Sequence, residues 1–209
     1  MALWIDLNAD LGESYGNWRM GDDAALLGVV TSANIACGFH AGDPLTIRTT
    51  VRQAVLHNVV IGAHISYHDL IGFGRRTIDI EPQALEADVL YQLAALDGVC
   101  RSEGSKVRYV KAHGALYHRM NVDPIQAGAV LSAVRAYDSS LTLLGAPASN
   151  AAGPTSSPGP TVPLPDRQAG SGAPACTMHC FSTWVQSAHD DNSNPRCTKR
   201  RARIASGSR

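Results

Sequence analysis

Acidic and amide side chains occupy every second position in a short segment near the N-terminus. The segment IDLNADLGES alternates the apolar Ile5 and Leu7 with polar residues. These polar residues, with one further acid just beyond them, are Asp6, Asn8, Asp10 and Glu13. Alternate residues of a β-strand share one face. Two carboxylates and an amide would not help to build a hydrophobic core, so we expect this row to belong to a functional site.

Three further motifs place histidines, acids and basic residues where strand-like segments end. They read NIACGFHAGD, AHISYHDLIGFGRR and KAHGALYHRM. The residues that we select from them are Asn34, His40, Asp43, His64, Tyr67, Asp69, Arg75, Arg76, Lys111, His113 and Tyr117. In a parallel sheet the strand ends meet at one edge, so we expect one shared site there. Asp10, His40, His64 and His113 are its candidate catalytic residues, and the others are candidates for binding substrate or phosphate.

Two kinds of chemistry suit such a set. Acids and imidazoles can bind a divalent metal ion that activates water. They can also act as general acids and bases on an amide, while Lys111, Arg75 and Arg76 hold a carboxylate or a phosphate. The sequence contains no HExxH motif. A divalent metal is therefore possible, but its ligands are unknown at this stage.

Some of these residues have simpler explanations. Asp43 is equally well suited to cap a helix, because an Asp-Pro pair recurs at 123–124 without a histidine motif. Arg75 and Arg76 would be ordinary surface charges, although Gly72 and Gly74 beside them suggest a backbone packed close to a ligand. The sequence CTMHC at 176–180 has no standard zinc spacing. No GxGxxG or GxxxxGK[ST] phosphate loop is present.

The elements that position these residues alternate between strand and helix. We expect strands at Leu3–Asn8, Ala33–Ala36, Val59–Ala63, Val107–Lys111 and Leu141–Leu144. Asp43-Pro44 and Asp123-Pro124 each predict the start of a helix, because aspartate caps it and proline needs no N–H there. A third helical stripe runs through Leu85, Val89, Leu93 and Leu96. The alternation predicts a parallel sheet covered by helices, either a (β/α) barrel or an open doubly wound sheet.

The pattern stops after Ala148. Residues 149–209 are rich in Pro, Gly, Ser and Arg, and we expect this low-complexity tail to be disordered. Residues 1–150 carry 11 basic and 15 acidic side chains, whereas residues 151–209 carry 7 and 3. The basic cluster near the C-terminus is better explained as a solvated tail than as a nucleic-acid site.

The remaining bulk properties narrow the class of protein. No segment approaches the ~20 apolar residues that a membrane span needs, and the N-terminus shows no signal peptide. We therefore expect a cytoplasmic protein without membrane or nucleic-acid partners. Five cysteines with irregular spacing do not suggest a disulfide framework.

The four motifs, taken in order, resemble the LamB/YcsF family, which is the A subunit of the prokaryotic ATP-dependent 5-oxoprolinase. The resemblance covers about residues 3–147. It implies a seven-stranded (β/α) barrel of the glycoside hydrolase/deacetylase type, here incomplete and confined to residues 1–148. It also implies ATP-dependent hydrolysis of a lactam, 5-oxoproline, to glutamate, with partner subunits B and C. ATP would phosphorylate the amide oxygen, and Asp10 or a neighbouring histidine would be the base.

The chain departs from the family pattern at three places. His68 and Ala112 stand where the family usually has proline. Residues 149–209 resemble no later part of the family, which leads to the hypothesis of a truncated homologue with a frame-shifted C-terminus. Two alternatives to a working 5-oxoprolinase component stay open: a metal-dependent, deacetylase-like amide hydrolase, and an inactive truncated homologue.

Overall fold

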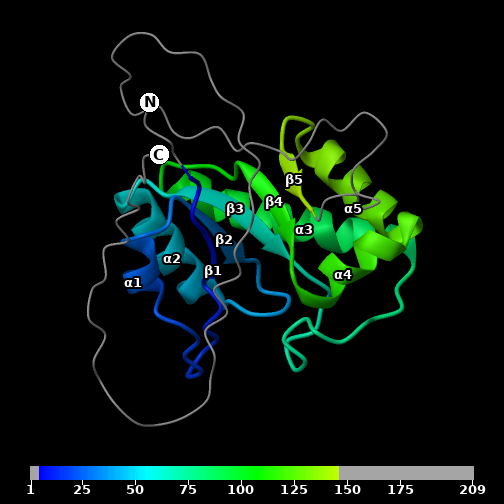
Figure 1. Cartoon of the computed structure of the whole chain (residues 1–209), viewed down its shortest axis with the longest axis horizontal. Helices are drawn as coiled ribbons and strands as arrows, with labels where there is room; N and C mark the ends of the chain where they lie inside the picture. Colours follow the sequence, from blue (N-terminus) through cyan, green and yellow to red (C-terminus); the bar gives the residue numbers. More distant parts are fainter. Residues whose placement is uncertain (1–4, 146–209) are drawn as a thin grey trace, which may run out of the picture.

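A computed structural model describes residues 5–145, which form an α/β fold around one parallel sheet (Figure 1). The five strands are β1 (Asn8–Leu11), β2 (Ser32–Ala36), β3 (Val60–Ile65), β4 (Tyr109–Ala112) and β5 (Thr142–Leu144). The helices are α1 (Asp23–Leu27), α2 (Pro44–Leu56), α3 (Pro82–Ser102), α4 (Gly114–Val122) and α5 (Pro124–Tyr137). The spatial order of the strands is their chain order, and every neighbouring pair is parallel. Such an arrangement is consistent with an incomplete barrel.

The strand predictions are confirmed in number and order, but the first is wrong in its position. Of the segment expected at Leu3–Asn8 the structure describes residues 5–8, and there the strand begins only at Asn8 and runs to Leu11. The partner strand explains the shift, because Asn8 is paired with Ser32, the first residue of β2. Residues before Asn8 therefore lie beyond the start of the strand that would pair with them.

The capping predictions for two helices are confirmed. The Asp43 carboxylate accepts hydrogen bonds from the backbone N–H groups of Leu45 and Thr46, and α2 begins at Pro44. Asp123 caps α5 in the same way ahead of Pro124. Aspartate satisfies N–H groups that have no partner within the helix, which fixes where each helix starts.

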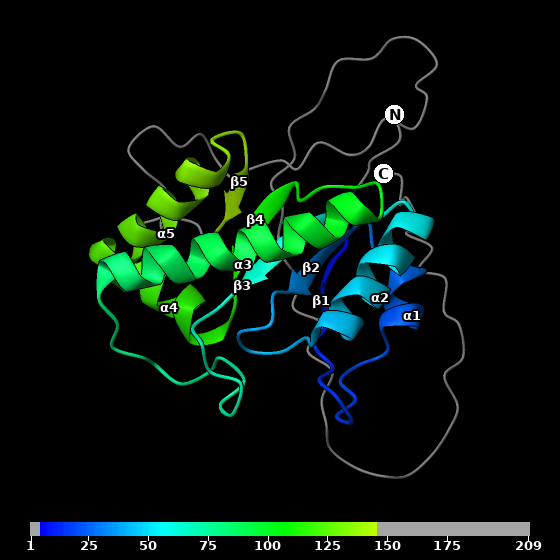
Figure 2. The ribbon, with the colours of Figure 1, turned by 180° about the vertical axis from the view of Figure 1, so that it is seen from behind.

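One face of the sheet is apolar and is covered by helices. Its side chains include Ile35, Ile61, Ile65 and Val110, all buried. Helices α2 and α3 pack against β2 and β3, and both lie in front of the strands in Figure 2. The predicted stripe of α3 (Leu85, Val89, Leu93 and Leu96) is fully buried in the same core. Burial of this face holds the strands in register.

The opposite face of the sheet carries polar side chains, because successive residues of a strand point to opposite sides. The strand register places Asp10 beside Asn34, and His64 beside Lys111. This is the face on which the functional site lies.

Within residues 5–145 no helix is long and apolar enough to cross a membrane. The expectations for the tail, including CTMHC, concern residues outside the described range.

Asp97 of α3 joins three parts of the fold through one carboxylate. Its oxygens accept hydrogen bonds from the Val107 N–H at 2.8 Å, from the Tyr137 hydroxyl at 2.6 Å and from Arg101 at 2.7 Å. The Asp97 side chain is only 2% exposed. Burial would raise the pKa of Asp97, but these three donors outweigh it and lower the pKa below the ordinary value.

We predict that Asp97→Ala lowers the free energy of unfolding by about 2 kcal/mol, because it leaves buried donors without a partner. The carboxylate is stabilising while it is ionised. The loss should therefore be full above pH ~4 and should shrink as the pH falls through the lowered folded-state pKa. Urea unfolding at several pH values measures it. Glu86→Ala on the same helix is the control, since no hydrogen bond to another residue of the described range 5–145 involves the Glu86 carboxylate. Equal effects of the two substitutions would contradict the prediction.

Candidate functional site

Asp10 stands at the centre of a polar row on the open face of the sheet. The Lys111 ammonium lies 2.6 Å from one Asp10 carboxylate oxygen, and the Asn34 amide donates to the same oxygen at 2.7 Å. Asn8 continues the row by donating to Asn34 at 3.2 Å and to the Ser32 hydroxyl at 2.8 Å. Strands β1, β2 and β4 thus supply one connected network. This network fixes the Asp10 carboxylate in position, and the second oxygen of the carboxylate faces His64.

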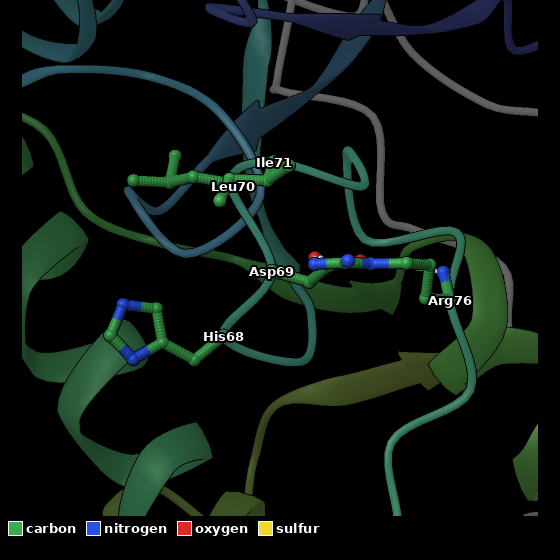
Figure 3. A pocket seen from close by; sticks show the side chains of 5 residues that line it. All are labelled: His68, Asp69, Leu70, Ile71 and Arg76. Carbon is green, nitrogen blue, oxygen red and sulfur yellow. Dashed lines mark hydrogen bonds and ion pairs between the residues drawn. The ribbon is translucent and has the colours of Figure 1, made fainter.

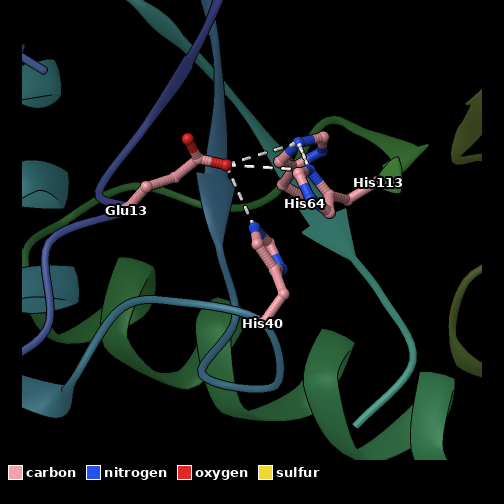
Figure 4. A group of neighbouring side chains, drawn as sticks. All are labelled: Glu13, His40, His64 and His113. Atoms are coloured by element: carbon pink, nitrogen blue, oxygen red, sulfur yellow. Dashed lines mark hydrogen bonds and ion pairs between the residues drawn. The ribbon is translucent and has the colours of Figure 1, made fainter. Parts of the chain in front are cut away.

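Three histidines converge on Glu13, which follows β1 (Figure 4). One Glu13 carboxylate oxygen, Oε1, lies 3.1 Å from His40 Nε2, 3.7 Å from His113 Nδ1 and 3.9 Å from His64 Nε2. The two last nitrogens are 3.0 Å apart. The imidazoles of His40 and His113 stack, with ring centroids 3.9 Å apart. The sequence-based prediction that His40, His64 and His113 meet is therefore confirmed by the geometry.

The second ring nitrogens of two histidines face backbone carbonyl groups. His113 Nε2 lies 2.9 Å from the carbonyl oxygen of Phe73, and His64 Nδ1 lies 3.3 Å from that of Lys111. His64 Nε2 also lies 3.3 Å from Asp10 Oδ2. Asp10 and the histidine cluster are therefore one continuous site.

Burial and neighbouring charges shift the pKa values of the site. Burial and the nearby Asp10 charge raise the pKa of Glu13 to about 7, against the opposing effects of His64 and Lys111. For Asp10 burial acts in the same direction, but His64 and Lys111 hold its pKa below the usual range. Burial lowers the pKa of His40. Burial, together with the neighbouring His40 and His64, lowers the pKa of His113 to about 2. Near neutral pH, Asp10 is ionised and these two imidazoles are uncharged.

The segment Asp69–Arg76 folds over the histidines and explains the glycines that the sequence places there. Phe73 and Gly74 both have positive φ angles, of 52° and 62°. This turn aims the Phe73 carbonyl at His113. A Cβ atom on Gly74 would meet the Ser66 hydroxyl first, and it would lie 2.8 Å from His113 Cδ2 and 2.9 Å from His40 Cβ. Glycine is required because the backbone touches the imidazoles.

Asp69 and Arg76 face one another across the same segment (Figure 3). The Arg76 guanidinium donates hydrogen bonds to the Asp69 carboxylate. These hydrogen bonds lower the pKa of Asp69. Arg75 lies over the Phe73 ring, 5.6 Å from its centroid. His68, which stands at a family proline position, stacks on Phe39 at 4.5 Å. The pair of Arg76 and Asp69 thus stabilises the segment, and Arg75 is exposed beside it.

Other predicted site residues lie outside the Glu13 cluster. Asp43 caps α2 and also accepts a hydrogen bond from the Gly16 N–H, so helix capping is sufficient to explain this residue. Tyr67 is buried, and its hydroxyl donates to Gln126 of α5 at 3.3 Å. Asp6 accepts from Thr31 and Ser32 at the start of β2. Tyr117 is half-buried on α4.

Sequence reasoning missed Tyr109, which belongs to the polar row. Its hydroxyl accepts a hydrogen bond from the Asn8 amide at 2.9 Å, and its ring occupies the space where a Gly62 side chain would be. Tyr109 lies two residues before Lys111, as Asn8 lies two before Asp10. That shared period-2 spacing was the available signal. Tyrosine is common in cores, so the signal is weak without the register.

The fold and site define an α/β protein in which a parallel sheet presents ionised and imidazole side chains on its open face. A model of the LamB/YcsF family matches residues 5–162. The chain belongs to the LamB/YcsF family.

Named relatives agree with this family. The 5-oxoprolinase A subunit of Acinetobacter baumannii (strain AB307-0294) is 58% identical over 148 residues, which cover 71% of this chain and 58% of that protein. The 5-oxoprolinase A subunit of Nocardia farcinica is 57% identical over 141 residues, 68% of this chain and 56% of that protein. The crystal structure of the lactam utilization protein from Thermus thermophilus is similar at a TM-score of 0.69 and 46% identity.

That similarity covers 70% of this chain and 60% of the Thermus chain. The chain spans a little over half of the length of the curated relatives that it matches. The word "subunit" in their names indicates that the relatives work as parts of a larger enzyme.

We predict that Gly74→Ala destabilises the fold by about 1–3 kcal/mol more than Gly16→Ala. Both glycines have positive φ, of 62° and 57°, so the backbone strain of alanine is similar at the two positions. Only Gly74 has histidine atoms in the way of a Cβ, whereas nothing lies within 4 Å of the corresponding position at Gly16. Thermal unfolding of the two variants gives the difference. Equal losses would mean that the segment does not press on the imidazoles.

Proposed function

We propose that this chain acts as the A subunit of a multi-subunit 5-oxoprolinase, which opens 5-oxo-L-proline to L-glutamate with hydrolysis of ATP. Its identity of 58% to the A subunit of a bacterial 5-oxoprolinase carries the proposal. The complete assembly would include subunits B and C in the cytoplasm. In the longer relatives, further βα units would complete a seven-stranded barrel of the glycoside hydrolase/deacetylase type.

The chemistry of a lactam explains the need for ATP in this proposal. The amide is stabilised by resonance, so water attacks it slowly. Phosphorylation of the amide oxygen would make the ring carbon more electrophilic, so that water can add to it. The C–N bond of the ring would then break, with the nitrogen leaving as the protonated amine, and hydrolysis of the resulting acyl phosphate would give glutamate and phosphate. The required protein groups are a carboxylate beside the water and a cation beside the phosphate.

Asp10 and Lys111 supply that pair in the proposed mechanism. Asp10 is ionised, and Lys111 and Asn34 fix its orientation at 2.6 and 2.7 Å. The carboxylate can therefore orient an attacking water and accept its hydrogen bond. Lys111 is 15% exposed and can also meet a substrate carboxylate or phosphate. Exposed Arg75 is the second candidate for that anion, since Arg76 is already held by Asp69.

We expect the chain, mixed with partner subunits B and C, to convert 5-oxoproline to glutamate only when ATP is present. Asp10→Asn should lower turnover by at least about a hundredfold, because asparagine has no negative charge to orient the water and to hold Lys111. Asp79→Asn, an exposed acid of the loop before α3, is the control and should keep turnover. Glutamate and phosphate release are measured together.

Three outcomes would overturn this proposal. Full turnover by Asp10→Asn would remove Asp10 from the mechanism. Glutamate formation without ATP would favour an ATP-independent, deacetylase-like amide hydrolase. Absence of turnover by the unsubstituted chain with both partners would mean that this chain is inactive.

A further inference from the structure

We propose that Glu13, His40, His64 and His113 form a binding site for one divalent transition-metal ion of the zinc class. The inference goes beyond the proposed function, because ring opening by phosphorylation requires no metal ligand from these four residues. It rests on three independent features of the site. They are the separations of the donor atoms, the placement of the ring hydrogens and the chemical type of the donors.

The donor atoms are spaced as the corners of a metal coordination shell. One atom from each residue can be chosen so that all four lie within 4.8 Å of one another. The separations include 3.0 Å between His64 and His113, and 3.1 Å between His40 and Glu13. Metal–ligand bonds of about 2.0–2.1 Å in a tetrahedron put neighbouring donors about 3.3 Å apart. The observed spacing brackets that value, so small rotations of side chains would close the shell.

The placement of the ring hydrogens leaves lone pairs pointing at one another. A backbone carbonyl can only accept, so the His113 Nε2 that faces Phe73 and the His64 Nδ1 that faces Lys111 must carry the hydrogens. In uncharged rings the other nitrogens, His113 Nδ1 and His64 Nε2, then have bare lone pairs 3.0 Å apart. Two lone pairs at that distance repel unless a cation lies between or beside them.

Acidic oxygens surround the same point. His64 Nε2 faces Asp10 Oδ2 at 3.3 Å and Glu13 Oε1 at 3.9 Å, and the latter oxygen lies 3.7 Å from His113 Nδ1. None of these atoms is a donor when the carboxylates are ionised. A cation bound among these acceptors would be stabilised by all of them.

The outer contacts have the form expected around a metal ion. Histidines that bind metals usually donate their other ring N–H to a carbonyl or a carboxylate, which fixes the ring orientation. His64 and His113 both face such a carbonyl. The positive φ of Phe73 serves this contact, because it turns the carbonyl toward His113. Gly74 then holds the backbone against His40 and His113, which limits rotation of both rings.

The donor set selects the class of ion. Three imidazole nitrogens and one carboxylate oxygen suit zinc and its neighbours in the transition series. Magnesium and calcium prefer oxygen ligands, so we expect them to bind poorly here. The competing explanation is a proton that Glu13 holds or that His64 and His113 share, which would satisfy the lone pairs without any metal.

Zinc titration by calorimetry distinguishes these explanations, and it needs neither ATP nor partner subunits. The protein is the full chain with Cys176, Cys180 and Cys197 changed to serine, so that the thiolates of the C-terminal segment cannot bind zinc. We expect one zinc ion per chain and no comparable binding of magnesium. Cobalt should give the visible absorption of a nitrogen–oxygen site without sulfur bands.

Two variants test the assigned ligands, and a third is the control. His113→Gln and Glu13→Gln should each weaken zinc binding by more than about tenfold. His118→Ala should bind as tightly as the background, because His118 is exposed on α4 outside the cluster. Circular dichroism checks the folding of each. Should His113→Gln fail to fold, Glu13→Gln decides, since its side chain is 16% exposed in a loop.

A second readout measures the stability of the fold instead of the heat of zinc binding. Zinc should raise the unfolding midpoint of the background protein and of His118→Ala, but not that of Glu13→Gln. Absence of zinc binding to the background protein would overturn the proposal, as would equal affinity in Glu13→Gln. Loss of 5-oxoprolinase turnover together with intact zinc binding would overturn the proposed function alone.

Discussion

The parallel register of β1 to β4 is the constraint on which the rest of the site depends. It pairs Asp10 with Asn34 and His64 with Lys111, and so brings groups from distant parts of the chain onto one face. Burial of the opposite, apolar face under the helices maintains that register. A slip of one residue would turn every polar side chain toward the helices. The chemistry of the open face thus rests on hydrophobic packing behind it.

Electrostatics then gives adjacent acids different roles. His64 and Lys111 keep Asp10 ionised, whereas burial raises the pKa of Glu13 to about 7. Neither carboxylate would be placed this way for stability alone, because burying charge beside charge costs free energy. The cost is tolerated at functional sites, where shifted acids and uncharged imidazoles are useful.

The segment after β3 completes the site from above. Asp69 and Arg76 tie its ends, Phe73 turns a carbonyl toward His113, and Gly74 lies against the rings. Gly74 is explained by its contact with the imidazoles and Gly72 by its contact with Asp69 and Arg76, which refines the sequence-based idea of a backbone packed close to a ligand. A mobile loop would leave His40 and His113 free to rotate. Fixed by this turn, they keep their nitrogens directed at Glu13.

The sequence by itself determined the helix starts at Asp43 and Asp123, the parallel α/β class and the meeting of His40, His64 and His113. These follow from local rules: capping, periodicity and the common edge of parallel strands. The tertiary structure alone decided that Asp43 and Tyr67 lie outside the cluster, that Tyr109 joins the polar row and that Glu13 receives three histidines. The start of β1 was also beyond local reasoning, since a partner strand fixes it. Distances between side chains depend on register and loop geometry, which no short stretch of sequence contains.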